Sequence, residues 1–211
     1  TVNVALIASI LGQWLKFSEK DIRILTISGL LHDIGKIMIP NEILTKPGKL
    51  TVAEYNIMKQ HVNFGYEKVK NQNIDIRIKE ACLLHHEKCD GTGYPFGLKS
   101  DHIPAVAKII AIADVYDAMT SARVYRGALC PFEVIDTMYK DAFTKFEPEY
   151  ILPFLKNVAS SYINNDVRLS DGRIGKVVLI NENALSLPIV QCEDEFIDLS
   201  KTRGLTVSAI L

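Results

Sequence analysis

The chain has 211 residues, of which 48% are hydrophobic and 23% are charged, and its formal net charge is -1 at pH 7. This composition is typical of a globular protein and excludes disordered, collagen-like and membrane-embedded classes. Because a net charge near zero supplies no global field for duplex nucleic acid, an anionic ligand would need a local cluster of cations or metals.

The first part of the chain predicts two packed helices. Apolar residues recur at helical spacing over residues 2–15 and again over 22–31, where Ser18 is a suitable N-terminal cap. The second helix continues into His32-Asp33, and Gly35 is the residue at which we expect it to end. No apolar run here is long enough to cross a bilayer, so we expect no membrane segment in this chain.

The middle of the chain predicts two further helices that carry histidines. Thr51 and Glu54 form a capping-box pattern, which predicts that a helix begins there and carries His61. Another apolar-periodic segment, residues 74–84, leads directly to His85-His86. Histidines therefore adjoin helix ends at several points of the sequence.

A glycine-rich loop and a longer helix follow. The helical pattern stops over residues 90–95, where glycines and a proline predict a loop. Pro104 is typical of a first helical turn, and the helix that it opens carries Asp114 and Asp117 before it ends near Ser121.

The C-terminal part changes from helical to β-favouring patterns. Pro131 and Pro148 predict the starts of two more helices, and after about Tyr162 the pattern changes to short β-favouring runs broken by turn residues. The predicted strands are 167–169, 174–180, 189–190 and 196–199. Asp171-Gly172 suits a hairpin turn, because both residue types tolerate a positive φ. We predict a mainly α fold with a helical domain at 1–163 and a small β-rich subdomain at 164–211.

The histidines and aspartates at these positions are good ligands for borderline and hard metals such as iron, manganese and zinc. The candidate ligands are His32, Asp33, His61, His85, His86 and Asp114. Because adjacent helical residues point about 100° apart, His32 and Asp33 cannot chelate one ion as an i, i+4 pair would. Two neighbouring ions remove this difficulty: Asp33 would bridge them, His32 and Asp114 would bind one ion, and the other histidines the second.

Other polar residues leave alternatives open. His102 has the sequence context of a solvated loop residue, and we leave it out of the site. Asp117, one turn after Asp114, could compete for the ligand role or support it from behind. Lys36 is either a favourable cation at a helix C-terminus or a fixed charge that stabilises an attacked phosphate. Four cysteines stand without a CxxC pair, which argues against a thiolate site and indicates a reducing, cytoplasmic location: Cys82, Cys89, Cys130 and Cys192.

At this point the residues resemble a known family, the HD-GYP branch of HD-domain phosphohydrolases. His32–Lys36 resembles the HD signature, and His85–Leu98 resembles the extended GYP signature. The resemblance continues through Ile103-Pro104, Ala113–Ser121, Arg123–Arg126 and Phe146–Pro148, and so covers roughly residues 1 to 160. A chance match to all of these segments in order is implausible.

The resemblance implies a helical bundle around two or three divalent metal ions, commonly iron or manganese. Members of the family hydrolyse cyclic di-GMP to linear pGpG and sometimes on to GMP. The resemblance also implies that the six candidate ligands bind the metals, and it selects Asp114 over Asp117. Lys36 matches a catalytic lysine beside the scissile phosphate, and Arg123 and Arg126 match cations that hold substrate phosphate. Gly93 and Tyr94 match the loop that approaches the guanine base, although Tyr94 could instead plug the core.

One departure from the family pattern keeps other functions open: a further metal-binding histidine is expected just before the segment that resembles Val2–Ala5. Cys89 and Val124 also replace residues common in the family, but neither position is expected to bind metal and both replacements are tolerable. We expect a metal-bridging hydroxide to attack phosphorus, with Asp33 as the pivotal ligand. The alternatives are a sensor or protein-interaction module without catalysis, and a hydrolase of a related cyclic dinucleotide such as cyclic GMP-AMP. A homodimer and an upstream sensory domain are left open.

Overall fold

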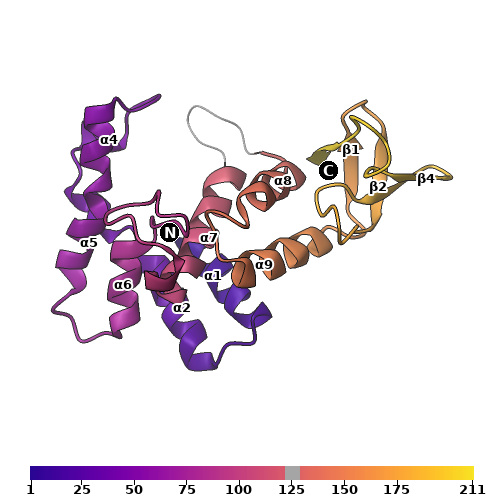
Figure 1. Ribbon diagram of the computed structural model, residues 1–211. Coiled ribbons are helices and arrows are strands. Elements are labelled where there is room, and N and C mark those ends of the chain that lie inside the picture. The colour runs from indigo at the N-terminus through magenta and orange to yellow at the C-terminus, as the bar shows by residue number, and fades with distance from the viewer. Residues whose placement is uncertain (122–128) are drawn as a thin grey trace.

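Apolar periodicity together with capping and proline signals predicts most of the observed helices. The structure is a computed structural model, and it describes residues 1–121 and 129–211. A bundle of helices is followed by a small antiparallel sheet (Figure 1), which confirms the predicted fold class. The α-helices are α1 (Val2–Trp14), α2 (Glu19–Leu31), α3 (Asn41–Leu44), α4 (Val52–Lys59), α5 (His61–Val69), α6 (Ile76–Leu84), α7 (Ala105–Thr120), α8 (Pro131–Asp141) and α9 (Pro148–Ser161), with short 3-10 helices η1 (Ile34–Met38) and η2 (Ser100–His102).

Capping interactions fix several of these helix starts. The Ser18 side chain accepts a hydrogen bond from the Asp21 amide at the start of α2. Thr51 and Glu54 form the complete capping box that the sequence predicts at the start of α4. Because these side chains satisfy backbone N–H groups that lack helical partners, they define where the helices begin.

The centre of the bundle is formed by α1, α2, α6 and α7, which pack on one another around buried aliphatic side chains. Leu11, Leu25 and Ile109 are fully buried in this core. Gly29 lets α2 approach α1 closely, since a Cβ at this position would lie 2.5 Å from the Cα of Ala5. This packing brings the C-terminal ends of α2 and α6 alongside the middle of α7.

Two predicted helix boundaries are wrong. The helix expected to end at Gly35 ends at Leu31, and the chain tightens into η1 from Asp33, whose φ is -97° and ψ 8°. Gly35 does not terminate a helix; it lies inside η1, where a Cβ would meet the His61 carbonyl oxygen at 2.0 Å. The helix expected to carry His61 is interrupted at Gln60, so that His61 is the first residue of α5.

The C-terminal sheet contains β1 (Asp166–Leu169), β2 (Ile174–Leu179), β3 (Ile189–Cys192), β4 (Glu195–Asp198) and β5 (Val207–Ile210), in the order β4-β3-β2-β1-β5. All neighbouring strands are antiparallel, and Gly172 takes a φ of +94° in the predicted β1–β2 turn. β5 is missing from the sequence prediction, because its four residues carry little β signal of their own and it is defined by pairing with β1.

One hydrophobic cluster connects the helices to the sheet. Buried residues from α8 and α9, such as Phe132 and Phe154, belong to the same cluster as Val167 in β1 and Val207 in β5. The predicted boundary at 163–164 lies between the end of α9 and the start of β1, and the division into two folding units stays a prediction. No helix within the described parts of the chain is long and apolar enough to cross a membrane.

Candidate metal centre

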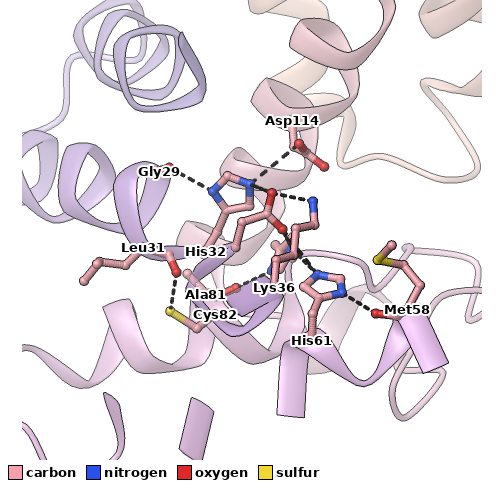
Figure 2. Close-up of polar contacts among 11 residues, drawn as sticks. Gly29, Leu31, His32, Lys36, Met58, His61, Ala81, Cys82 and Asp114 are labelled. Carbon is pink, nitrogen blue, oxygen red and sulfur yellow. Dashed lines mark hydrogen bonds and ion pairs between the residues drawn. The ribbon is translucent and has the colours of Figure 1, made fainter. Parts of the chain in front are cut away.

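Four segments contribute the predicted ligands to one place: the turn from α2 into η1, the start of α5, the end of α6, and α7. Figure 2 shows His32, His61, Lys36 and Asp114 converging from the end of α2, the start of α5, η1 and α7. The ligand atoms form two groups, each with its members within 4.8 Å of one another. One group is His32, Asp33 and Asp114, and the other is Asp33, His61, His85 and His86. Asp33 belongs to both groups, which is the arrangement that a bridging carboxylate requires.

Backbone carbonyl groups fix the orientation of three histidine rings. The Nδ1 atoms lie 2.8 Å from the Gly29 carbonyl oxygen for His32, 2.7 Å from that of Met58 for His61, and 2.9 Å from that of Ala81 for His85. Because a carbonyl oxygen only accepts hydrogen bonds, each Nδ1 is the protonated nitrogen. Each Nε2 lone pair of the neutral ring is therefore directed into the cluster, ready to bind a metal.

Two buried polar atoms fit a metal better than they fit the protein around them. Asp33 Oδ1 and His32 Nε2 are buried without a well-formed hydrogen bond in the described structure, although His32 Nε2 lies 3.2 Å from Asp33 Oδ2 and 3.6 Å from Asp114 Oδ1. Unpartnered buried polar atoms are uncommon in folded proteins and point to an ion or a special role. Asp33 Oδ1 lies 3.4 Å from His61 Nε2 and 4.0 Å from His85 Nε2, so these atoms surround a shared space. This nitrogen and oxygen donor set suits iron, manganese or zinc.

The electrostatics keep His85, His86 and Asp33 in their metal-binding forms, whereas His32 is protonated in the metal-free protein. Burial lowers the pKa of His86 to about 4 and that of His85 well below its ordinary value, so both rings are neutral near pH 7. Burial would raise the pKa of Asp33, but the neighbouring His32 and Lys36 lower it, so the carboxylate is ionised. For His32, burial favours the neutral ring, yet the carboxylates of Asp114 and Asp33 raise its pKa to about 9. A proton on His32 thus supplies the positive charge that the two carboxylates attract in the metal-free protein.

Cys82 lies near this cluster but is unsuited to ligation. Its Sγ donates to the Leu31 carbonyl oxygen at 3.4 Å (Figure 2). Burial raises the pKa of Cys82 to about 12, so the thiol stays protonated at neutral pH. The centre therefore depends on imidazole and carboxylate groups.

The structure separates Asp114 from the other polar candidates. Asp117 lies outside both ligand groups; its Oδ1 accepts hydrogen bonds from the Asn3 side chain and the Ser121 hydroxyl, both at 3.0 Å. It therefore ties α1 to the end of α7. His102 is exposed in η2 and takes no part in either group.

Lys36 reaches the rim of the cluster. Its Nζ lies 2.6 Å from Asp33 Oδ2, and 37% of its side chain is exposed. The ammonium group thus touches the carboxylate that both ligand groups share and also faces solvent. Both alternatives for Lys36 required a charge near the end of α2, and this position places the charge directly beside the candidate metal centre.

The glycine-rich loop lies directly on His86. A Cβ at Gly93 would lie 2.4 Å from the Lys88 backbone nitrogen, so glycine permits the close approach of the loop to the turn after α6. The Tyr94 amide donates to the His86 carbonyl oxygen at 3.1 Å, and the two rings stack with centroids 4.7 Å apart. Tyr94 lies outside the hydrophobic clusters of the described chain, which argues against its role as a core plug.

Glu87 holds this loop in place, a role that the sequence analysis missed. It is 4% exposed, and its two carboxylate oxygens accept hydrogen bonds from the amides of Phe96 at 2.7 Å and Leu98 at 2.8 Å. An acidic residue directly after His85-His86 is a weak signal, because its partners lie nine and eleven residues further along the chain. Arg123 and Arg126, predicted to hold substrate phosphate, lie outside the described residues.

Comparisons with known proteins identify the family to which the sequence is similar. The sequence model of the HD domain matches residues 1–150. The chain is 36% identical over 192 residues to the cyclic di-GMP phosphodiesterase PA4108 of Pseudomonas aeruginosa, an alignment that covers 90% of this chain and 46% of that protein. It is 41% identical over 155 residues to the cyclic di-GMP phosphodiesterase response regulator RpfG of Xanthomonas campestris, covering 72% of this chain and 41% of that protein.

A related activity occurs among the other similar proteins. The chain is 44% identical over 117 residues to 3'3'-cGAMP-specific phosphodiesterase 1 of Vibrio cholerae, covering 54% of this chain and 26% of that protein. Among solved structures, an HDGYP protein from Bdellovibrio bacteriovorus, Bd1817, has a similar fold, with a TM-score of 0.59 at 23% identity over 72% of this chain and 49% of that chain. The chain spans about half the length or less of these relatives.

Proposed function

This chain belongs to the HD domain family and carries the signature of its HD-GYP branch, and from this premise we propose that it is a metal-dependent phosphodiesterase that hydrolyses cyclic di-GMP. The observation that carries the proposal is the pair of ligand groups that share Asp33. Support for the substrate comes from the relatives named cyclic di-GMP phosphodiesterases, one of which aligns with 90% of the chain. The proposed product is linear pGpG, with further cleavage to GMP.

We assign the metal ligands as the two groups divide them. His32, Asp33 and Asp114 would hold one divalent ion, and Asp33, His61, His85 and His86 would hold the other, with iron or manganese as the expected metals. Divalent ions held there supply Lewis acidity, which lowers the pKa of water and neutralises charge on phosphate oxygens. A third ion, which the family resemblance allows, would need further ligands.

The protein's own residues orient and polarise this centre. The carbonyl groups of Gly29, Met58 and Ala81 hold three rings by their Nδ1 protons, so the ligand positions are set before substrate binds. Preorganised groups of this kind need no reorganisation during reaction, which is where much catalytic stabilisation arises. Lys36 adds a positive charge at the rim, where it can stabilise the negative charge on the attacked phosphate. Arg123 and Arg126 are proposed to bind substrate phosphate through their guanidinium groups.

A second substrate is supported by the comparisons. Three of the similar proteins are named 3'3'-cGAMP-specific phosphodiesterases, at 35–44% identity. The two cyclic dinucleotides share the phosphodiester ring and differ in one base. The metal centre would act on either, and selection between them depends on the groups that contact the bases.

The test combines metal analysis with turnover. Protein prepared without oxygen is analysed for bound metal and then incubated with cyclic di-GMP or 3'3'-cGAMP, with linear products separated by chromatography. We expect at least two metal ions per chain and pGpG as product. Asp33→Ala should lose both metal and turnover. His102→Ala, which removes an exposed imidazole outside the cluster, should keep both.

Two results would contradict the proposal. Turnover of Asp33→Ala at the wild-type rate would remove Asp33 from the centre. Tight binding of cyclic di-GMP by the metal-loaded wild-type protein without any product would instead identify a sensor.

A further inference from the structure

We propose that α4 forms part of the substrate site, with Tyr55 as a stacking surface for a guanine base and Lys59 as a cation for the second phosphodiester of the cyclic dinucleotide. The inference rests on the proposed function and adds residues to its substrate site that the signature motifs do not include. Four features of the described structure support it: the exposure of α4, the ring contacts of Tyr55, the unpaired charge of Lys59 and their shared position beside Tyr94.

Packing alone does not explain the position of α4. None of its eight residues is buried, and Figure 1 shows the helix at the margin of the bundle, above α5. Its first turn is held by the capping box and by an ion pair between Lys46 and Glu54 at 2.7 Å. An isolated helix this short is marginal in water. The chain nevertheless maintains α4 with the Tyr55 side chain exposed, which leaves this ring accessible to a ligand.

Tyr55 is linked to the metal centre by a series of ring contacts. Its ring meets that of Tyr94 edge to face, with centroids 6.5 Å apart and an interplanar angle of 81°. Tyr94 in turn stacks on His86, a proposed metal ligand. Because Tyr55 is 48% exposed, part of its ring remains open to a ligand. A base attached to a phosphate at the metal centre can reach this ring, and stacking on an exposed tyrosine is a common way to bind a base.

Lys59 lies one helical turn after Tyr55, on the same side of α4. Its Nζ is 5.4 Å from the centroid of the Tyr55 ring and 6.0 Å from that of Tyr94. The side chain is half-buried, and no carboxylate oxygen lies within 4.0 Å of its ammonium group in the described part of the chain. Lys36, the other lysine close to the centre, is paired with Asp33. Lys59 is therefore positioned to supply an uncompensated positive charge to an anionic ligand.

The chemistry of the substrate matches this pair of side chains. A cyclic dinucleotide has two bases and two phosphodiesters, and only one diester can be attacked at the metal centre at a time. The second diester and a base must then lie on neighbouring surface. An aromatic ring beside a free ammonium group offers one partner to each of them. Residues that contact the bases would also decide between cyclic di-GMP and 3'3'-cGAMP.

The test separates substrate binding from metal chemistry. Tyr55→Ala and Lys59→Ala are assayed with cyclic di-GMP and with methyl 4-nitrophenyl phosphate, a chromogenic diester without a base or a second phosphate. We expect each variant to raise KM for cyclic di-GMP about tenfold, the effect of losing one stacked base or one phosphate contact. Turnover of the small diester and the metal content should stay at wild-type values. Tyr55→Phe, which keeps the ring, should restore the KM for cyclic di-GMP.

Matched controls come from the same protein. Tyr139→Ala removes a tyrosine of α8 that is 39% exposed and contacts Phe143, outside the candidate site. Lys68→Ala removes an exposed lysine of α5. Both controls should leave the KM for cyclic di-GMP unchanged.

Each outcome bears on one claim. An unchanged KM in Tyr55→Ala, or equal losses on both substrates together with lost metal, would overturn the role of α4. Calorimetric binding of cyclic di-GMP to the same variants keeps the test independent of turnover, with about tenfold weaker binding expected and equal binding contradicting the inference. If the wild-type protein cleaves the small diester but not cyclic di-GMP, the proposed function fails, whereas the binding result still decides the role of Tyr55.

Discussion

Gly35→Ala is expected to separate the two elements that hold Asp33 and His61 together. Gly35 lies in η1, two residues after Asp33, and packs against the start of α5. A Cβ at this position would lie 2.0 Å from the His61 carbonyl oxygen and 2.4 Å from the Gly65 backbone nitrogen. Both neighbours are backbone atoms, so no side-chain rotation can relieve the overlap. η1 or α5 has to move.

The size of the effect follows from these distances. Carbon contacts are most favourable near about 3.5 to 4.0 Å, so η1 and α5 would have to separate by more than about 1 Å. Overpacking of this kind costs about 1–3 kcal/mol, and two backbone overlaps place Gly35→Ala at the upper end of the range, near 3 kcal/mol. In a chain of this size such a loss lowers Tm by about 6–12 °C.

Gly65→Ala is the matched control, because Gly65 lies on the opposite side of the same contact. A Cβ at Gly65 would meet its nearest atoms at 3.4, 3.6 and 3.8 Å, which are ordinary contact distances. Gly65 lies inside α5, where alanine is favoured over glycine by about 1 kcal/mol. We therefore expect Gly65→Ala to be neutral or slightly more stable than the wild-type protein.

The assay is chemical or thermal unfolding of both variants together with metal analysis of the folded proteins. Gly35→Ala should lose stability and metal together, because Asp33 and His61 lie on the two sides of the disrupted contact. Gly65→Ala should lose neither. Wild-type stability for Gly35→Ala, or destabilisation of Gly65→Ala by a similar amount, would refute the close backbone contact.

Three further outcomes follow from the site. Glu87→Ala leaves two loop amides without their acceptor and should lower the free energy of unfolding by about 1–3 kcal/mol while the bound metal is kept; unfolding and metal analysis check this, and simultaneous loss of metal would contradict it. Lys36→Met should keep two metals and lower kcat about 100-fold, because the charge acts mainly on the transition state; an unchanged kcat would remove Lys36 from catalysis. In metal-free protein, the unfolded chain binds more protons than the folded one between pH 6.5 and 4, because the pKa of His86 falls from 6.5 to about 4 on folding. Stability should therefore drop by about 3 kcal/mol as the pH falls through that window. His32 acts in the opposite direction, since its raised pKa of about 9 makes stability fall as the pH rises from 6.5 to 9. The free energy of unfolding of the metal-free protein, measured by denaturation at a series of pH values, should therefore be highest near pH 6.5. A free energy of unfolding that does not change with pH would contradict this assignment.

Helix starts could be predicted from sequence because their signals are local. Ser18 and the Thr51 capping box act within three residues of the backbone groups that they satisfy. The end of α2 and the start of α5 could not be predicted in the same way. They depend on the close contact of Gly35 with His61 and Gly65 in α5, which lie 26 and 30 positions further along the chain. Similarly, β5 is defined by pairing with β1 rather than by its own pattern.

In the candidate site, too, the residue types could be predicted from the sequence, whereas contacts between residues far apart in the chain could not. The types of the ligand residues predict a two-metal arrangement, and the structure brings these residues together in two groups that share Asp33. The role of Glu87 was not predictable, because a carboxylate followed by a glycine-rich loop does not specify which amides will turn back to it. Tyr55 and Lys59 also carry no motif, and their relation to Tyr94 arises only from packing.

The most direct test of the centre is an anomalous-scattering crystal structure of the metal-loaded protein. We expect two ions close to each other, the first bound by His32 and Asp114, the second by His61, His85 and His86, with Asp33 in contact with both. A single ion that does not touch Asp33, or ions bound elsewhere with this cluster left without metal, would contradict the proposed two-metal centre.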